Sequence, residues 1–135
     1  NSIEPGKLPL NNMSPALVFD SSGVRIAVGA SGGRRITNCV TQLAIKIIDF
    51  GMGPQEAIDS PRVDCSMPYT STDPRLDKSV VSELNRRGHN IEPIGDGGLD
   101  RGFPSFASPV VIVRDGDKVL RAGVDVFQSA YAAGI

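Results

Sequence analysis

Apolar residues in the first part of the chain form short continuous runs and then one long helical stripe. The runs "ALVFD" (16–20) and "VRIAVGA" (24–30) are rich in Val, Ile and Phe and are separated by "SSG", which predicts a β-hairpin. Because both runs are apolar at consecutive positions, we expect strands that are covered on both faces. A helical spacing of apolar residues then predicts one strongly amphipathic helix over 36–48. Its stripe consists of Ile36, Val40, Leu43, Ala44, Ile47 and Ile48.

Prolines and glycines divide the middle of the chain. Pro54 follows "GMG" at a first helical position and begins a short second helix, which Pro61 closes. A third helix is predicted from Asp77, as the N-cap residue, to Gly88, as the residue after the C-cap. We expect the apolar side chains of this third helix to face the core. They are Val80, Val81 and Leu84.

The last third of the chain returns to strand patterns. "NIEPI" (90–94) predicts a strand, and "SPVVIVRDGDKVLRAGVDV" (108–126) predicts a hairpin with "DGD" as its turn. Between them, the glycine-rich "GDGGLDRGFPS" (95–105) is a candidate for a mobile loop or lid. Strands in blocks on either side of helices favour an α+β layered fold over a doubly wound parallel sheet. The chain has 135 residues, which is the size of a single domain, residues 1–135.

Composition and charge exclude several classes of partner. The net charge is −1, with acidic and basic residues interspersed, which disfavours nucleic acid and anionic membrane surfaces. No apolar run is long enough to span a bilayer. Two cysteines make neither a disulfide framework nor a four-ligand zinc site. We expect Cys39 to be a small core residue, and His89, the only histidine, to lie in a loop rather than at a catalytic centre.

The stretch "VGASGGRRI" (28–36) places two adjacent glycines between a strand and a helix. Bare N–H groups at a helix start can bind phosphate, but the spacing matches neither the dinucleotide-binding nor the Walker pattern. Glycines can also simply permit close packing or a positive φ angle. In a third interpretation, the N–H groups of Gly32 and Gly33 form an oxyanion hole for acyl transfer.

Three ordered motifs favour the third interpretation. "PGKLPLNNMSP" (5–15), "GASGGRRI" (29–36) and "DFGMGPQEAIDSPR" (49–62) resemble, with matching gaps, motifs of the γ-glutamyltranspeptidase family of N-terminal-nucleophile hydrolases. The resemblance is close over the first half of the chain, and it returns more loosely in "LNRRGHNIEPI" (84–94) and near the C-terminus. It implies that this chain forms part of an αββα sandwich.

The resemblance also implies an enzyme that transfers or hydrolyses γ-glutamyl groups of glutathione or other γ-glutamyl amides, with no metal or organic cofactor. In the family, a precursor cleaves itself and exposes a threonine that attacks the amide. Gly32 and Gly33 would supply the oxyanion-hole N–H groups. The family's threonine lies upstream of what corresponds to Asn1. We therefore expect this chain alone to be inactive and to act with the remainder of the precursor, which is the large subunit and the start of the small subunit.

A second implied site is the loop before the first strand. Asn11 and Asn12 stand where the family has two serines that hold the α-carboxylate of the substrate. Met13 would line the pocket, while Ser14 and Pro15 would fix the loop. An Asn amide can donate to a carboxylate as Ser can, but it is longer and adds a carbonyl oxygen. A related acylase with another acyl group therefore stays open.

Structural roles are expected for the other marked residues. Arg35 matches the arginine after the family's glycine pair, and we expect it to bond loop carbonyls or a carboxylate such as Asp59. We expect Arg62 to cap or clamp the structure and Asp125 to be a structural loop acid.

Two further expectations concern assembly and location. Apolar faces and a sheet edge left open in the isolated chain predict a two-fold homodimer. The family resemblance points to a periplasmic or secreted protein. The alternative function is a noncatalytic binding or assembly module on the same scaffold.

Overall fold

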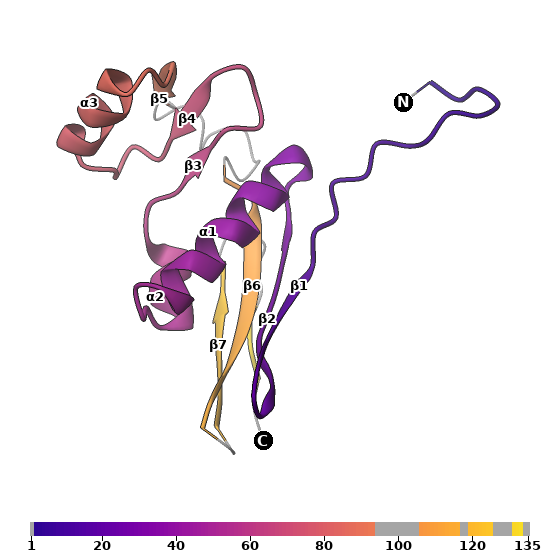
Figure 1. The fold of residues 1–135 in the computed structure, drawn as a ribbon, viewed down its shortest axis with the longest axis vertical. Coiled ribbons are helices and arrows are strands. Elements are labelled where there is room, and N and C mark those ends of the chain that lie inside the picture. The colour runs from indigo at the N-terminus through magenta and orange to yellow at the C-terminus, as the bar shows by residue number, and fades with distance from the viewer. Residues whose placement is uncertain (1, 94–105, 117–118, 126–130, 134–135) are drawn as a thin grey trace.

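The computed structural model describes residues 2–93, 106–116, 119–125 and 131–133, and this part of the chain contains two sheets with helices packed on them. Two helices cover one face of the larger, four-stranded sheet (Figure 1). A smaller, three-stranded sheet and a third helix form a separate lobe near the start of the first helix (Figure 1). This arrangement confirms the predicted α+β class. The candidate lid, 95–105, lies outside the described residues.

Both predicted hairpins contribute to the larger sheet. Strands β1 (Ala16–Asp20) and β2 (Gly23–Ser31) form the first, and β6 (Ser108–Asp115) and β7 (Val119–Val124) form the second. The strand order is β1-β2-β6-β7, and every neighbouring pair is antiparallel. Since side chains alternate along a strand, the register that aligns Val28 with Val111 places both on the same, helix-covered face.

The predicted amphipathic helix is α1 (Ile36–Ile48), and a 3-10 turn over Gly33–Arg35 precedes it. Its apolar stripe packs against β2 and β6. Ile26 and Val111, which are 0% and 1% exposed, lie at the centre of this core. The buried residues that α1 contributes are Ile36, Cys39, Val40, Leu43 and Ile47.

Helix α2 (Pro54–Asp59) lies so close to β7 that a glycine is required between them. A Cβ atom at Gly123 would lie 2.6 Å from the carbonyl carbon of Pro54, which is shorter than real contacts allow. The Gln55 side chain secures the same contact, since it accepts from the Val124 N–H (3.0 Å) and donates to the Val124 carbonyl (3.1 Å). These contacts hold the end of β7 against the helix.

Replacing Gly123 by alanine is expected to lower the free energy of unfolding by about 3 kcal/mol, because α2 or β7 must move to admit the methyl group. Denaturant titration of the full-length protein measures this loss. The control is Gly116→Ala in the turn of the same hairpin. Its φ is +70° and nothing lies within 4 Å of the added atom, so only a backbone cost of about 1 kcal/mol is expected. Equal losses in the two variants would contradict the close packing of α2 on β7.

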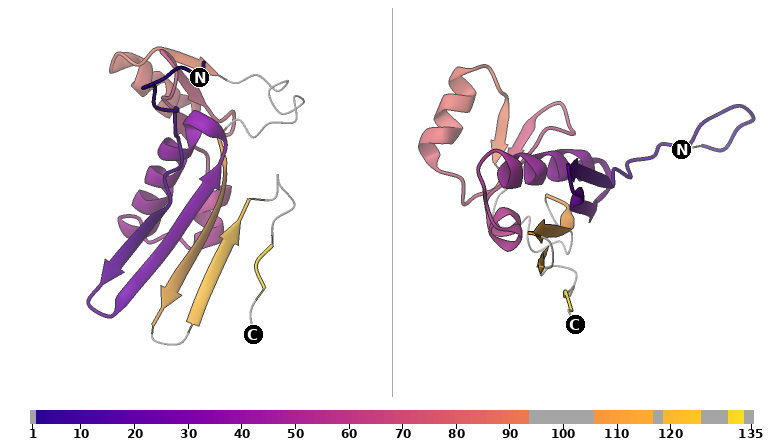
Figure 2. Two further views of the ribbon diagram at one scale, coloured as in Figure 1. Left: turned by 90° about the vertical axis from the view of Figure 1, so that its right-hand side faces the viewer. Right: turned by 60° about the horizontal axis from the view of Figure 1, so that its bottom comes forward.

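The face of the larger sheet that points away from α1 and α2 is apolar and open. Figure 2 (left) shows the two helices behind the sheet, with no described helix over its near face. The described chain therefore meets the prediction of strands covered on both faces for one face only, because its single layer of helices covers that face and leaves the other open. Residues Tyr131 to Ala133 and the strands line a hollow on the open face. Its exposed apolar side chains include Leu17, Val110, Ile112 and Leu120.

The smaller sheet contains two strands that the sequence pattern does not predict. Strands β3 (Val63–Asp64) and β4 (Thr70–Thr72) are too short to show a period, whereas β5 (Ile91–Pro93) coincides with the predicted strand. Strand β4 pairs antiparallel with β3 and parallel with β5. The lobe thus joins segments that precede and follow the third helix.

Helix α3 (Lys78–Arg86) has the predicted ends but not the predicted packing. The Asp77 carboxylate accepts from the Ser79 N–H (2.7 Å), and Gly88 follows the helix with a φ of +91°. No residue of α3 is buried, and Val80 is 44% exposed, so the prediction that it faces the core is wrong. The helix instead packs on β5, away from the main core. Val81 and Leu84 are half-buried there.

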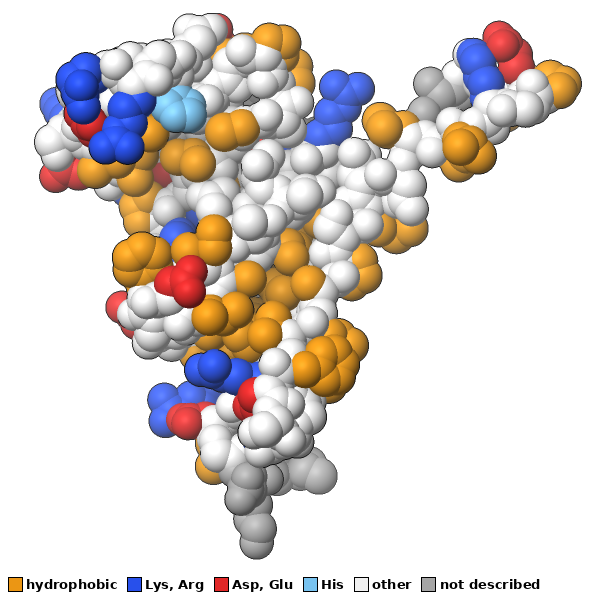
Figure 3. Space-filling view, viewed as in Figure 1, with side chains coloured by type: hydrophobic (Ala, Val, Ile, Leu, Met, Phe, Trp, Pro, Cys, Tyr) orange, Lys and Arg blue, Asp and Glu red, His pale blue; other side chains and the backbone are white. Residues whose placement is uncertain are grey.

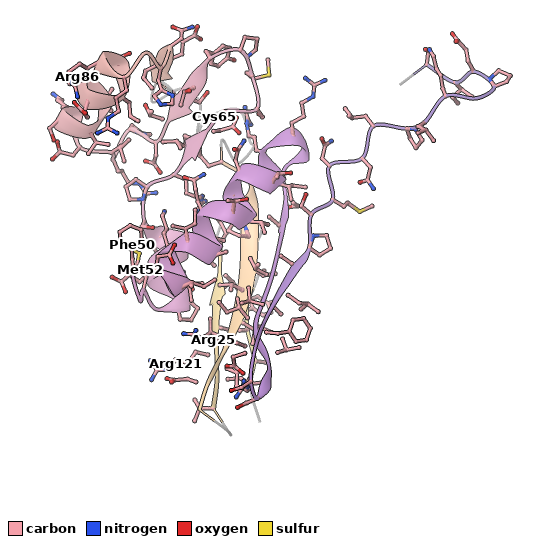
Figure 4. All side chains as sticks on the ribbon, viewed as in Figure 1. Arg25, Phe50, Met52, Cys65, Arg86 and Arg121 are labelled. Atoms are coloured by element: carbon pink, nitrogen blue, oxygen red, sulfur yellow. The ribbon has the colours of Figure 1, made fainter. Side chains whose placement is uncertain are left out.

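The two cysteines differ in exposure, and their reactivity tests the fold. Cys39 is 1% exposed in the core, as predicted, and burial raises the pKa of its thiol to about 11. Cys65 is exposed after β3 (Figure 4). At pH 8 we expect iodoacetamide to modify Cys65 and to leave Cys39 unmodified, because the Cys39 thiol is protonated and inaccessible. Peptide mass mapping of the native protein measures this, and equal labelling of both thiols would contradict the packing of α1.

Candidate functional site

The glycine pair lies where β2 ends and the helical segment begins, as predicted. Gly32 has a φ of +141° and Gly33 a φ of +64°, conformations that other residues rarely adopt. Gly33 is the first residue of the 3-10 turn, so its N–H has no acceptor within that turn. Among the described residues, neither glycine donates its N–H to a backbone carbonyl. Two adjacent backbone donors therefore stand at this end of the sheet.

Gly32 packs directly against the backbone of Ala107, which immediately precedes β6. A Cβ atom at Gly32 would lie 2.7 Å from the Ala107 Cα atom. Ala107 is itself 1% exposed and has a φ of +62°, the one positive value for a non-glycine residue in the described part of the chain. A residue persists in such a conformation only where its surroundings hold it. The close approach explains why position 32 requires glycine.

Arg62 is buried and clamps several segments around Ala107. Its guanidinium donates to the carbonyls of Ile58 and Ala107 and lies 3.3 Å from the Asp125 carboxylate. Its Nε atom is a buried donor without an acceptor among the described residues. Burial, together with the positive charge of Arg62, lowers the pKa of Lys46. The predicted clamping role of Arg62 and structural role of Asp125 are confirmed.

Arg35 pairs with a carboxylate, as predicted, but this carboxylate belongs to Asp64 and not to Asp59. The Arg35 Nε atom lies 3.5 Å from Asp64 Oδ2, whereas Asp59 accepts from Gln55 on its own helix (3.0 Å). The reason is the position of α2. Its end is bonded to Lys46 near the end of α1, while β3 returns to the start of α1 and presents Asp64 there.

The predicted substrate loop leaves the body of the protein just before β1 (Figure 1). Asn11 Oδ1 accepts from the Met13 N–H (2.9 Å), which forms a local turn. Ser14 Oγ donates to the Asn12 carbonyl (3.3 Å) and lies 3.0 Å from Thr37 Oγ1. Because Thr37 is in the first turn of α1, which follows the 3-10 turn that Gly33 begins, this contact brings the loop close to the glycine pair.

The residues of the loop differ in exposure. Asn12 and Ser14 are half-buried, whereas Asn11 is exposed. Met13 is 76% exposed, and Pro15 lies at the hollow of the open sheet face. Figure 3 shows that the segment before this loop stands away from the body of the protein and exposes hydrophobic side chains along its length.

Three residues around the glycine turn escape sequence-based prediction: Thr37, Asp64 and Ala107. Thr37 contacts Ser14 of the loop, Asp64 contacts Arg35, and Ala107 contacts Gly32. In each pair the two residues are far apart in the sequence. The position of Thr37 within one helical turn of the glycines was an available signal, because it places the hydroxyl at the start of α1. Asp64 and Ala107 carry no comparable signal.

The described residues contain no cluster of three or more His, Cys, Asp or Glu side chains that could hold a metal ion. No described helix is both long enough and apolar enough to cross a membrane. His89 is exposed in the loop after α3, as predicted.

The chain is similar to known proteins over its whole length, since residues 1–135 match the gamma-glutamyltranspeptidase family. It is 34% identical over 92 residues to the glutathione hydrolase proenzyme of Bacillus subtilis subsp. natto, a match that covers 67% of this chain and only 16% of that protein. A mutant gamma-glutamyltranspeptidase of Helicobacter pylori has a similar structure (TM-score 0.77, 25% identity, 93% of this chain and 66% of that chain). So does the cephalosporin acylase of Bacillus halodurans (TM-score 0.71, 26% identity, 84% and 20%). These similarities confirm the predicted N-terminal-nucleophile hydrolase fold class.

Proposed function

The chain belongs to the gamma-glutamyltranspeptidase family, and on this premise we propose that it is part of an enzyme that transfers or hydrolyses γ-glutamyl groups. The observation that carries the proposal is the turn at Gly32 and Gly33, which offers two adjacent backbone N–H donors at the end of β2. Such donors stabilise the negative charge that develops on a carbonyl oxygen when a nucleophile attacks it. We assign these two N–H groups to the oxyanion hole.

The attacking group is proposed to come from another part of the protein. The Bacillus relative is named a proenzyme, and this chain spans only 16% of its length. By the sequence resemblance, the nucleophile is a threonine that precedes the segment corresponding to this chain. Its hydroxyl oxygen would bond to the γ-glutamyl carbonyl carbon, and the amine would leave with a proton. Water or an acceptor amine would then release the acyl group. Both steps pass through a tetrahedral oxyanion, so Gly32 and Gly33 would act twice.

Asn11 and Asn12 are proposed to hold the α-carboxylate of the acyl donor. The Asn11 Oδ1 atom already accepts from the Met13 N–H (2.9 Å), so the Asn11 Nδ2 group is the end left for a ligand, and it donates as a carboxylate requires. The contact between Ser14 and Thr37 (3.0 Å) keeps this loop beside the glycine turn. The exposed Met13 side chain would contact the acyl chain.

An acylase for another acyl group is the second candidate. The Asn amides carry carbonyl oxygens that the family's serines lack, and a carboxylate is repelled by a carbonyl oxygen that faces it. The similarity to a cephalosporin acylase gives this candidate a structural parallel. A substrate with a neutral group at this position would fit the same loop.

The open face of the main sheet is proposed to pack on a second sheet supplied by the remainder of the precursor, with 1–135 forming one folded segment of a single domain. Leu17 is 58% exposed, Ile112 46% and Leu120 69%, and burial of such an apolar surface favours association. If the chain were isolated, a two-fold dimer could cover the same face. Sedimentation of residues 1–135 alone should then show self-association at micromolar concentration.

A γ-glutamyl-p-nitroanilide assay on the full-length gene product tests the proposed function, with residues 1–135 alone as the control. We expect the precursor to cleave itself and the processed protein to release p-nitroaniline, while the control releases none. Self-cleavage without release would indicate that the substrate carries another acyl group. Cephalosporin-type amides would then be assayed. Absence of both self-cleavage and release would contradict the proposal and favour a noncatalytic binding or assembly module.

A further inference from the structure

Asp64 is a buried carboxylate beside the glycine turn, and it is 2% exposed. Its Oδ1 atom accepts from Asn38 Nδ2 (3.0 Å) and from the Ser66 N–H (3.3 Å). Its Oδ2 atom accepts from Ser66 Oγ (2.8 Å) and lies 3.5 Å from Arg35 Nε. The Ser66 N–H at Oδ1 and the Arg35 guanidinium at Oδ2 can only donate, so the site suits a carboxylate and not an amide.

The partners of Asp64 connect two segments of the chain. Ser66 follows β3 and fixes the carboxylate within its own segment. Arg35 ends the 3-10 turn that Gly33 begins, and Asn38 lies in the first turn of α1. The carboxylate therefore ties the end of the glycine turn and the beginning of α1 to β3.

The two glycines differ in how their surroundings hold them. Gly32 is fixed by its close approach to Ala107. Gly33 is exposed, and nothing lies within 4 Å of the position that a Cβ atom would occupy there. The next ion pair along the chain joins Arg35, whose side chain is 36% exposed, to the buried Asp64 carboxylate, and we infer that this pair orients the Gly33 end of the turn.

We propose that Asp64 is a positioning residue that holds the Gly32 and Gly33 N–H groups in their orientation through Arg35 and Asn38. The catalytic meaning of that orientation rests on the proposed function, whereas the structural link does not. Asp64 does not touch the reacting atoms in this assignment. It acts by keeping the two donors aimed at one point.

The consequence for turnover follows from geometry. A displacement of about 1 Å in a catalytic group costs about 100-fold in rate, and the substrate's other contacts are assigned to the separate loop at 11–15. Asp64→Asn keeps the volume of the side chain but replaces one acceptor oxygen by a donor. We therefore expect kcat to fall about 10- to 100-fold, with KM changed by less than about threefold.

Asp64→Asn in the full-length processed protein tests the proposal, with Asp73→Asn as the matched control. Asp73 is also buried, at 7% exposure, and is bound by Arg75 at 2.6 Å, but Arg75 connects it to the Asp59 carbonyl on α2. The readouts are kcat, KM and the hydrogen exchange of the Ile36 N–H, which donates to the Gly33 carbonyl. We expect a lower kcat and faster Ile36 exchange in Asp64→Asn and neither change in Asp73→Asn.

A second variant keeps the test decisive if Asp64→Asn does not fold. Asn38→Ala removes one donor to Asp64 and leaves the carboxylate and Arg35 in place, so a smaller loss of kcat, about fivefold, is expected with the same change in exchange. Unchanged Ile36 exchange, or an equal loss of kcat in Asp73→Asn, would overturn the proposal. A wild-type protein without γ-glutamyl activity would overturn the proposed function instead, and the exchange comparison would still decide the role of Asp64.

Discussion

Replacing Gly32 by alanine is expected to lower kcat for γ-glutamyl-anilide hydrolysis about 100- to 1000-fold, the effect of losing an oxyanion donor. The added Cβ atom would lie 2.7 Å from the Ala107 Cα atom and 2.8 Å from its Cβ atom. Since both neighbours are backbone or fixed to it, the turn itself must move and the Gly32 N–H must point elsewhere. Steady-state kinetics of the processed full-length protein measure the loss.

Gly51→Ala separates the clash from backbone strain. Gly51 has a φ of +67°, and nothing lies within 4 Å of a Cβ atom at that position. This substitution therefore carries a backbone cost of about 1–2 kcal/mol without a collision. We expect Gly51→Ala, after the end of α1, to keep wild-type kcat. A Gly32→Ala protein with wild-type kcat would contradict the role of the turn.

Replacing Arg62 by methionine is expected to lower the free energy of unfolding by about 3–5 kcal/mol, as when one member of a buried ion pair is removed. Methionine fills a similar volume, but the Asp125 carboxylate loses its guanidinium partner, which lies 3.3 Å away in the wild type. The Ile58 and Ala107 carbonyls lose a donor as well. Because Ala107 supports Gly32, we also expect kcat to fall. Denaturant unfolding and kinetics measure the two effects.

Arg86→Met is the matched control for Arg62→Met. Arg86 lies on α3 (Figure 4) and pairs with Glu83 at 2.6 Å, but its side chain is 72% exposed. Exposed ion pairs contribute little because water and salt screen them. We expect no measurable change in stability or kcat. Equal destabilisation by the two substitutions would mean that Arg62 is not the buried clamp that the structure describes.

Sequence pattern predicts best those elements in which the pattern repeats over many residues. Helix α1 shows its stripe over several turns, and the two hairpins carry their own turn signals, so local pattern is sufficient for them. Strands β3 and β4 consist of two and three residues, too few for any period to appear. Val80 illustrates a different limit, because a helical stripe indicates that one face is covered but not how completely. In α3 the covering partner is the small sheet and not the main core.

The candidate site could likewise be predicted from the sequence only in part. The sequence motif identifies Gly32 and Gly33, but the physical reason for glycine at position 32 depends on Ala107, which is far away along the chain. The need for a partner to Arg35 is also predictable from its charge. Which carboxylate meets it is decided by the path of the chain after α2, which carries Asp59 to one end of α1 and Asp64 to the other.

A crystal structure of the processed full-length protein with a γ-glutamyl phosphonate, which mimics the tetrahedral intermediate, tests the oxyanion-hole assignment most directly. We expect the oxygen that stands for the oxyanion to lie about 2.7–3.1 Å from both the Gly32 and the Gly33 nitrogen atoms. An oxygen bound by other donors, with both glycine nitrogens beyond hydrogen-bond distance, would contradict the assignment.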